Sequence, residues 1–286
     1  MVSGLFVNTK RYTIGFVHGT SIMSKLACLT YSLFFMLSYL FDTIKTLGIT
    51  PGHIIPPNFW IWTILTHQFV QVRLPFLFLD ITALLLSSHM FETAWGVPGF
   101  IIFFMVSTVI PGLCTAVVYL ITYVCTFNLS YLFDVHIHGL YGFISGVLVA
   151  IKQSKGEQML VGSIGLYMKS LPLLNISIFL IFYLCGLIAG SYVWMVVFGT
   201  FITWVYLRFF QSHSRGKGDY ADAFALRTFF PTPLNIPVGI ISNIVFSLLI
   251  KLGLCKKTAY RYDVGAPSKI TISLSGVDAI DAERRR

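Results

Sequence analysis

The sequence predicts an all-α membrane protein that crosses the lipid bilayer several times. Hydrophobic residues make up 56% of its 286 residues and charged residues only 11%, and the mean hydropathy is +0.80. So little polar surface cannot cover a water-soluble globule. Long apolar runs also recur along the chain, and proline, glycine and charged residues separate them. These observations exclude a soluble globular domain and predict a helical bundle in a membrane.

Six stretches are expected to cross the bilayer as helices. They are residues 22–41, 74–90, 97–125, 138–153, 171–188 and 190–210. Residues 91–96 form the short connection between the second and the third helix. Pro111 and Gly112 are placed to kink the third helix. A tight turn at Gly190 and Ser191 would make the last two helices antiparallel neighbours.

The fourth helix carries three glycines, Gly139, Gly142 and Gly146, which stand three and four residues apart. Small residues with this spacing line one face of a helix, where they let neighbouring backbones approach closely. Ser145 and His138 lie on the same helix, but they stand seven positions apart, which corresponds to roughly 10 Å along the axis. That distance is too long for proton transfer from a serine to a histidine.

The first loop is expected to rest on the membrane surface. Proline and glycine interrupt residues 42–58, which predicts irregular structure. Residues 59–71 are too short to cross the bilayer and are rich in aromatic side chains that prefer the headgroup region. Trp60 and Trp62 are therefore expected to be anchors, in preference to a gate for substrate.

Polar residues within the predicted spans are few. Asp80 lies inside the second helix, where a carboxylate is costly in lipid, and we expect it to face protein or water. A functional role and a hydrogen-bonded contact between helices both remain open for it. His136 and His138 form a pair before the fourth helix, but two ligands do not make a zinc site, and the five cysteines show no ligand spacing. We expect no metal and no cofactor.

The 20 lysines and arginines are distributed unevenly along the chain. With a cytosolic N-terminus and six crossings, all of them except Lys45 and Arg73 fall on the cytosolic side, as the positive-inside rule requires. The net charge of +9 is thus explained by orientation and by contact with an anionic leaflet, and we expect no nucleic-acid partner.

The chain is expected to divide into four parts. They are a cytosolic segment, 1–21, a six-span membrane domain, 22–210, a cytosolic connector with an interfacial helix, 211–254, and a basic cytosolic tail, 255–286. An amphipathic helix over 237–254 is favoured over a seventh crossing because its apolar residues form one stripe. The tail holds a short alternating run, 270–274, that is typical of a strand.

The order of these features resembles the rhomboid superfamily: six spans, an aromatic interfacial loop after the first, Glu92 followed by Gly96 after the second, and a glycine-patterned fourth helix. Within that superfamily the chain is most similar to the transmembrane protein 115 family. The segments that carry this similarity are PPNFWIWTILTH, FNLSYLF, IHG, WVYLRF, HSRGKGD, TFFP and YDVGAPSKITISL.

The resemblance to rhomboid proteases also indicates which residues occupy the catalytic positions. The protease GxSG motif falls on residues 139–142, so Tyr141 stands where the nucleophile would be. The histidine base corresponds to Val196, and the oxyanion donors correspond to Phe76 and Asp80. The Trp-Arg pair of the active enzymes is Trp62 and Thr63 here. The resemblance therefore implies a fold without the catalytic groups.

We expect the remaining marked residues to shape the core or to bind transmembrane clients. These candidates are Trp60, Trp62, Asp80, Glu92, Gly96, His138, Gly139, Gly142 and Gly146. The resemblance implies a self-associating, multi-pass Golgi protein with both ends in the cytosol and no enzymatic activity. It also implies support of Golgi-to-ER retrograde vesicle transport, an indirect effect on glycosylation, and contact with machinery such as the oligomeric Golgi tethering complex.

Two other classes of function stay open. An intramembrane protease would use Ser145 in an atypical site, although the expected base is absent. A transporter would use Asp80 and the histidines along a path, although the sequence has no inverted repeat.

Two N-glycosylation sequences occur, at Asn128 and Asn175. Asn128 falls on the predicted luminal side close to the membrane. Asn175 falls inside a predicted span and is not expected to be modified.

Overall fold

The computed structural model describes residues 22–156, 158–161, 166–213, 216–219, 221, 224–229 and 235–251. The expected segments 1–21 and 255–286, with the predicted strand 270–274, lie outside these residues.

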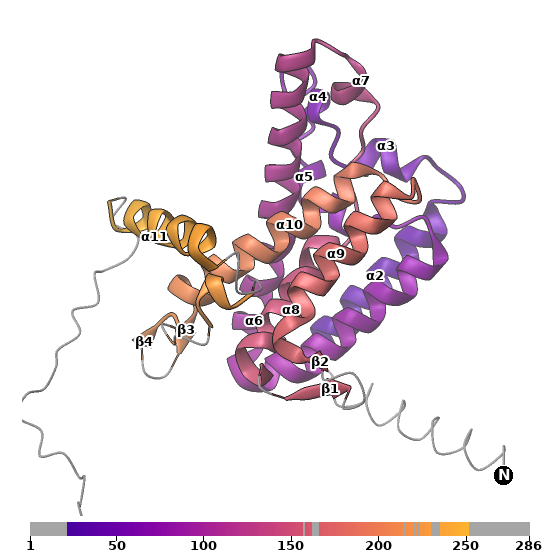
Figure 1. The fold of residues 1–286 in the computed structure, drawn as a ribbon. Coiled ribbons are helices and arrows are strands. Elements are labelled where there is room, and N and C mark those ends of the chain that lie inside the picture. The colour runs from indigo at the N-terminus through magenta and orange to yellow at the C-terminus, as the bar shows by residue number, and fades with distance from the viewer. Residues whose placement is uncertain are drawn as a thin grey trace, which may run out of the picture.

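A bundle of apolar helices forms the body of the protein, which confirms the all-α membrane fold (Figure 1). Its helices are α2 (Ile22–Leu37), α6 (Leu74–Thr126), α8 (Tyr141–Lys155), α9 (Leu171–Leu184) and α10 (Gly190–Val205), which continues into the π-helical turn η3 (Tyr206–Phe210). The helix α8 lies in the middle of the bundle and contacts α6, α9 and α10. Because α6 has two arms, the bundle contains the six predicted helical segments in the predicted order.

The helix α6 turns back on itself at Gly96. This glycine is its one residue with non-helical dihedral angles, with φ at 74° and ψ at 166°. Leu84 of the first arm and Phe100 and Phe104 of the second line one cavity, so the two arms lie side by side. The expected connection over 91–96 was therefore too long, because the first arm stays helical up to Trp95. Pro111, which is placed to kink the third helix, lies inside the second arm with helical dihedral angles.

Two other boundaries differ from those predicted. The helix α8 begins at Tyr141, because Gly139 has a left-handed φ of 92° and lies outside the helix. The turn between α9 and α10 lies at Gly186, with φ at 71°, and Gly190 is already the first residue of α10. Sequence periodicity located α8 and α10, but it did not identify Gly139 and Gly186 as the residues at which the chain turns before these helices.

Among the described residues, two helical stretches are long and apolar enough to cross a bilayer on their own, Leu74–Thr126 and Gly190–Phe210. The helices α2, α8 and α9 have 16, 15 and 14 residues. At 1.5 Å per residue they measure about 21 to 24 Å, which is less than the ~30 Å hydrocarbon core. Most residues of α8 are buried, so this short helix is largely enclosed by the other helices.

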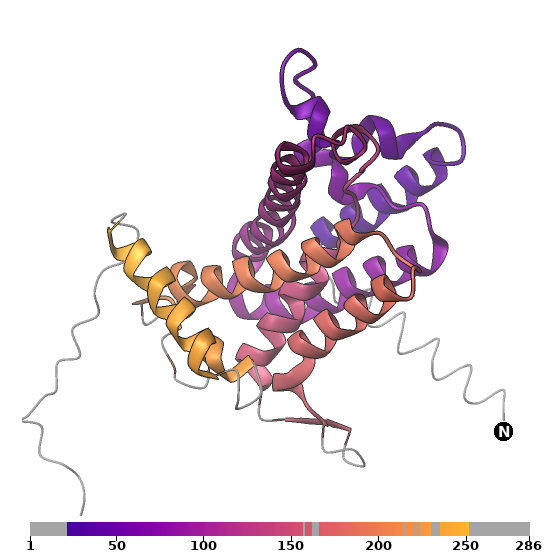
Figure 2. The ribbon, with the colours of Figure 1, turned by 45° about the horizontal axis from the view of Figure 1, so that its top comes forward.

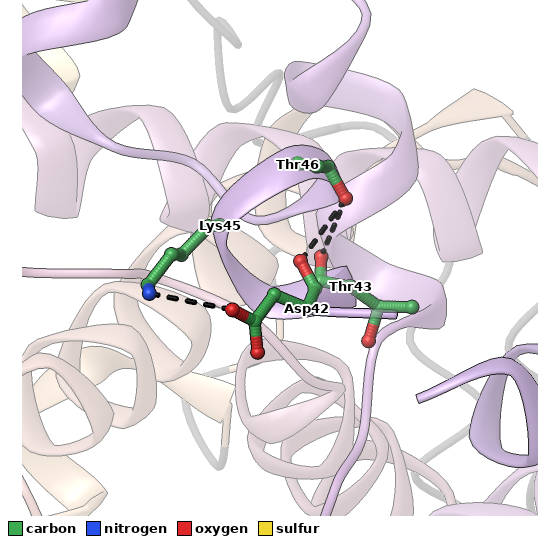
Figure 3. Close-up of polar contacts among 4 residues, drawn as sticks. All are labelled: Asp42, Thr43, Lys45 and Thr46. Atoms are coloured by element: carbon green, nitrogen blue, oxygen red, sulfur yellow. Dashed lines mark hydrogen bonds and ion pairs between the residues drawn. The ribbon is translucent and has the colours of Figure 1, made fainter. Parts of the chain in front are cut away.

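Short helices from two loops cover one end of the bundle (Figure 1). They are α3 (Thr43–Leu47), α4 (Pro51–Ile54), α5 (Thr63–Thr66) and η1 (His67–Phe69) of the first loop and α7 (Ser130–Phe133) of the third. An antiparallel bridge between Ile49 and Ile137 joins the loops. At the start of α3, Lys45 pairs with Asp42 at 3.4 Å, and the Thr46 hydroxyl donates to the Asp42 carbonyl at 3.2 Å (Figure 3).

The opposite end carries two hairpins and the last helix that the structure describes (Figure 2). These elements are β1 (Met159–Val161) with β2 (Leu166–Tyr167), η2 (Met168–Ser170), β3 (Ser212–His213) with β4 (Gly216–Lys217), η5 (Leu226–Phe229) and α11 (Asn235–Lys251). Phe246 of α11 stacks on Phe209 with ring centroids 5.7 Å apart. Ile240, Ile244 and Leu248 are exposed on α11, which overlaps the helix expected over 237–254.

Candidate functional site

The four residues at the positions of a rhomboid catalytic site come together at the start of α8. Tyr141 is its first residue, and Val196 of α10 lies in the same buried apolar cluster. The half-buried ring of Phe76 meets the Tyr141 ring edge-on, with centroids 5.7 Å apart. Asp80 lies one helical turn after Phe76 on α6 and is fully buried. These four residues therefore come from three helices, α6, α8 and α10, and lie close to one another.

Gln71 connects two of these residues by hydrogen bonds. Its side-chain Nε2 donates to Asp80 Oδ2 at 3.0 Å and to Tyr141 Oη at 3.3 Å. Its Oε1 accepts from the backbone N–H of Val72 at 3.1 Å, so both ends of the amide are engaged. Gln71 is only 1% exposed. Asp80 thus faces protein rather than lipid, as predicted, and its partner is a residue that the sequence analysis did not single out.

Aromatic rings close the site on its other side. The rings of Tyr141 and Tyr192 lie 4.5 Å apart, and the Tyr192 hydroxyl lies 3.2 Å from His138 Nε2. Phe179 of α9 meets Tyr141 edge-on at 5.6 Å. Burial lowers the pKa of His138 to about 4, so this imidazole is neutral at physiological pH. A neutral imidazole that bonds a tyrosine orients that tyrosine within the cluster.

The glycines of α8 allow its backbone to touch its neighbours. A Cβ atom placed on Gly199 of α10 would lie 2.5 Å from the Gly142 carbonyl oxygen. One on Gly146 would lie 2.6 Å from Thr203 Oγ1. These contacts are of the close-packed kind predicted for the glycine face. Gly139 is different, because it precedes the helix and its missing side chain leaves room for the Tyr141 ring.

Ser145 is fully buried and both of its hydrogen-bonding functions are engaged. Its hydroxyl donates to the Tyr141 carbonyl at 2.9 Å and accepts from Asn175 Nδ2 at 3.0 Å. In the described part of the chain, the two partners of Ser145 are a carbonyl and an amide, and neither is a general base. Asn175 itself is only 9% exposed, so this second glycosylation sequence is buried between helices. Asn128, in contrast, lies exposed in the third loop.

The two predicted anchors lie together in the first loop. The rings of Trp60 and Trp62 stack with centroids 5.6 Å apart, and Trp60 also packs on His53 at 4.4 Å. Trp62 is 51% exposed, and its Nε1 donates to the Thr46 carbonyl at 3.3 Å. An exposed ring with a bonded N–H suits the interface between lipid and water.

The predicted histidine pair does not converge on one point. His136 Nδ1 lies 2.8 Å from the Thr50 hydroxyl, whereas His138 is turned toward Tyr192. His67 lies on η1 and contacts the Ile64 carbonyl at 2.9 Å through Nδ1. Burial lowers the pKa of His136, and that of His67 to about 4. Among the described residues, no three histidine, cysteine or acidic side chains form a metal-binding group.

Glu92 and Gly96 shape the other end of the first arm of α6. Glu92 Oε1 accepts from the Ser24 hydroxyl at 2.6 Å, which ties α6 to α2. Gly96 then reverses the chain so that the second arm returns along the first. Together with the glycine-packed α8 and its neighbour α10, these features define a rhomboid-like integral membrane protein.

Comparisons with known proteins agree with this class. Residues 25–286 match the family described as eukaryotic integral membrane protein (DUF1751). Transmembrane protein 115 of Homo sapiens is 44% identical over 266 residues, 93% of this chain and 76% of that protein, and the Mus musculus protein is 43% identical over the same shares. Rhomboid-like protein 19 of Arabidopsis thaliana is 28% identical over 247 residues, 85% of this chain and 78% of that protein. No solved structure matches the chain. The chain belongs to the transmembrane protein 115 family of eukaryotic integral membrane proteins.

Proposed function

We propose that this rhomboid-like protein is not an enzyme and that it serves Golgi membrane traffic. One observation carries the first part of the proposal. Tyr141, at the position of the rhomboid nucleophile, is 1% exposed and its hydroxyl is bonded to the amide of Gln71. A nucleophile needs an adjacent base and a path to substrate, and this buried phenol is held in a cluster of amide and aromatic groups instead.

Ser145 supports the same conclusion. Its proton is directed to the Tyr141 carbonyl, and its lone pair accepts from Asn175. Val196 at the base position has no group that accepts a proton. A hydroxyl so engaged has neither a base to activate it nor room for an acyl group.

Client binding fits the groove between α2 and α6 better than the core around Asp80, which is fully buried. A cavity of about 220 Å³ opens there between Leu26 and Ala27 of α2 and Phe100, Ile101 and Phe104 of the second arm of α6. Its lining is mostly apolar, with Ser24 and Thr30 as polar members. A transmembrane segment of a client would pack its small or apolar side chains against this groove.

The traffic role is supported by membership of the transmembrane protein 115 family and by the resemblance described above. We propose a Golgi location with both ends in the cytosol, self-association, and support of retrograde transport to the ER, which would affect glycosylation indirectly. The groove between α2 and α6 of the membrane domain would hold clients, and the basic segment 255–286 would recruit the oligomeric Golgi tethering complex or similar machinery.

Labelling with a serine-directed fluorophosphonate tests the catalytic part of the proposal. The purified protein, an active rhomboid protease and the Ser145→Ala variant are treated side by side. We expect no labelling of this protein above that of the variant. Labelling that disappears only in the Ser145→Ala variant would establish an activated serine and refute the proposal.

Deletion of residues 255–286 tests the traffic part in cells that lack the endogenous protein. We expect the truncated chain to reach the Golgi, and to fail to restore retrograde transport of an ER-retrieved reporter or to co-purify the tethering complex. Full rescue and undiminished capture would contradict the division of labour between core and tail.

A further inference from the structure

A basic cavity lies at the C-terminal end of α8, far along this helix from the Tyr141 cluster. We name it the lysine pocket, and it has a volume of about 520 Å³. The last turn of α8 supplies Lys152 and Lys155, and the turn η2 supplies Lys169. The other side is closed by Asp219, Ala221, Phe224 and Thr228. The three lysines reach one cavity although they come from two separate elements.

Lys152 is unusual because its amine is buried. The residue is only 5% exposed, and its Nζ donates to the Thr228 hydroxyl at 2.9 Å. The Nζ also lies 3.4 Å from the centroid of the Phe229 ring. Within the described part of the chain it makes no ion pair. A hydroxyl and a ring replace only part of the hydration that a buried ammonium group loses, and buried charges in proteins normally have a counter-charge.

The charged side chains among the described lining residues give the lysine pocket a net positive charge. Lys155 and Lys169 are exposed and make no ion pair with any described residue. Asp219 is the one acidic side chain among the described lining residues, and its Oδ2 accepts from Gln153 Nε2 at 3.1 Å. Three lysines against one bonded carboxylate favour an anion with several acceptor oxygens, as a phosphate group has.

An apolar cavity adjoins the lysine pocket. This second cavity, of about 360 Å³, shares Gln153, Ser154, Lys155 and Asp219 with the first. Its remaining lining is Met90, Phe91, Ala94 and Trp95 at the end of the first arm of α6. A free phosphate ion would contact only the basic cavity, whereas a lipid has an anionic head and an apolar chain that match both.

We propose that the two adjoining cavities bind one anionic phospholipid. The lysine pocket holds the phosphate-bearing head group, and Lys152 receives from it the missing counter-charge. The glycerol and the first part of an acyl chain lie against Phe91 and Trp95. Helix ends with lysines beside apolar side chains favour such lipids at the inner surface of a membrane.

Binding of short-chain lipids to the full chain in uncharged detergent micelles tests this site. The probes are dioctanoyl phosphatidylinositol 4-phosphate, dioctanoyl phosphatidylcholine and soluble inositol 1,4-bisphosphate. We expect the phosphoinositide to bind at least tenfold more tightly than either of the others. The Lys155→Gln, Lys169→Gln double variant should lose about tenfold in affinity, because each lysine makes a charge-assisted contact with the phosphate. Both side chains are exposed, so the variant is expected to fold.

A second double variant, Lys256→Gln with Lys257→Gln, removes the same charge from the tail and serves as the matched control. It should bind the phosphoinositide within twofold of the wild type. An equal loss in both double variants would show unspecific attraction to a basic protein and would overturn the proposal. Equal affinity for phosphatidylcholine would overturn it as well. Binding of inositol bisphosphate as tight as that of the lipid would show a site for a soluble anion instead.

Discussion

The two ends of α8 contain polar side chains in opposite arrangements. At its start, Gln71, Asp80 and Tyr141 are each at most 1% exposed and are joined by hydrogen bonds in a cluster sealed by rings. At its end, Lys152 is also buried, but it borders an open basic cavity and makes no ion pair with a described residue. The first cluster is closed and its side chains bond one another, with Asp80 Oδ1 left without a partner among the described residues, and such an arrangement serves packing. A buried amine beside an open cavity indicates a ligand instead.

Acid should destabilise the first end of α8 most strongly. Burial lowers the pKa values of His67 and His138 to about 4 from an ordinary 6.5. The unfolded chain therefore binds more protons than the folded chain between these values, and stability falls as the pH falls from about 6.5 to about 4. Each histidine should contribute a loss of about 3 kcal/mol across this range.

Thermal unfolding in uncharged detergent between pH 7.5 and 4 measures this loss. The His138→Gln variant, which keeps a hydrogen-bonding group near Tyr192, should lose less stability over the same range. An unfolding midpoint that is independent of pH in the wild type would show that these imidazoles do not stay neutral in the fold.

A methyl group added between α8 and α10 should lower the stability of the protein almost as much as acid does. In Gly199→Ala the new Cβ would lie 2.5 Å from the Gly142 carbonyl oxygen, and backbone cannot move aside as a flexible side chain can. We expect a loss of about 2 to 3 kcal/mol in SDS-induced unfolding, as for other overpacked interiors. The matched control is Gly239→Ala in α11, where a Cβ meets nothing within 4 Å. Similar losses in both variants would mean that the contact of the two helices is not tight.

The glycine contacts show what the sequence could predict about this fold. Apolar runs located the helices, and the spacing of Gly142 and Gly146 identified the packed face of α8, because helix periodicity is a local property. The same spacing misplaced Gly139, since this glycine has a left-handed φ of 92° and lies before the helix, where a Cβ would meet the Tyr141 ring. The dihedral angles of a single residue leave no periodic signal.

The sequence identified two members of the candidate site, each through a different signal. Asp80 was identified because a carboxylate in an apolar run is costly, and Tyr141 because of its place in a motif. Gln71 had no such signal, because it meets Tyr141 across 70 residues only when the first loop folds back onto α8. The lysine pocket was missed for the same reason, since the fold brings α8 and η2 together with Asp219, Ala221, Phe224 and Thr228.

Removing the amide of Gln71 tests whether the first cluster is held by its hydrogen bonds. In Gln71→Leu, Asp80 and Tyr141 lose the donor they share, and we expect a loss of about 2 kcal/mol in SDS-induced unfolding. Gln71→Glu is a control of nearly the same shape that places a second carboxyl group beside Asp80, and it should be at least as unstable. The double variant Gln71→Leu, Asp80→Leu should recover part of the loss, because it leaves no buried carboxylate. Additive losses would show that Gln71 and Asp80 do not act as a pair.

At the other end of α8, the removal of a polar group should raise the free energy of unfolding instead of lowering it. Lys152→Met keeps the length and much of the apolar stem of the side chain but removes a buried charge that no described carboxylate balances. We expect the lipid-free protein to gain about 1 kcal/mol in SDS-induced unfolding, because an uncompensated buried cation lowers stability. An anionic lipid should then stabilise the wild type but not the variant, since ligand binding adds stability only to a fold that binds. If Lys152→Met unfolded as readily as Gln71→Leu, Lys152 would be a structural member of a closed hydrogen-bonded cluster like the one at Tyr141, and the contrast between the two ends of α8 would fail.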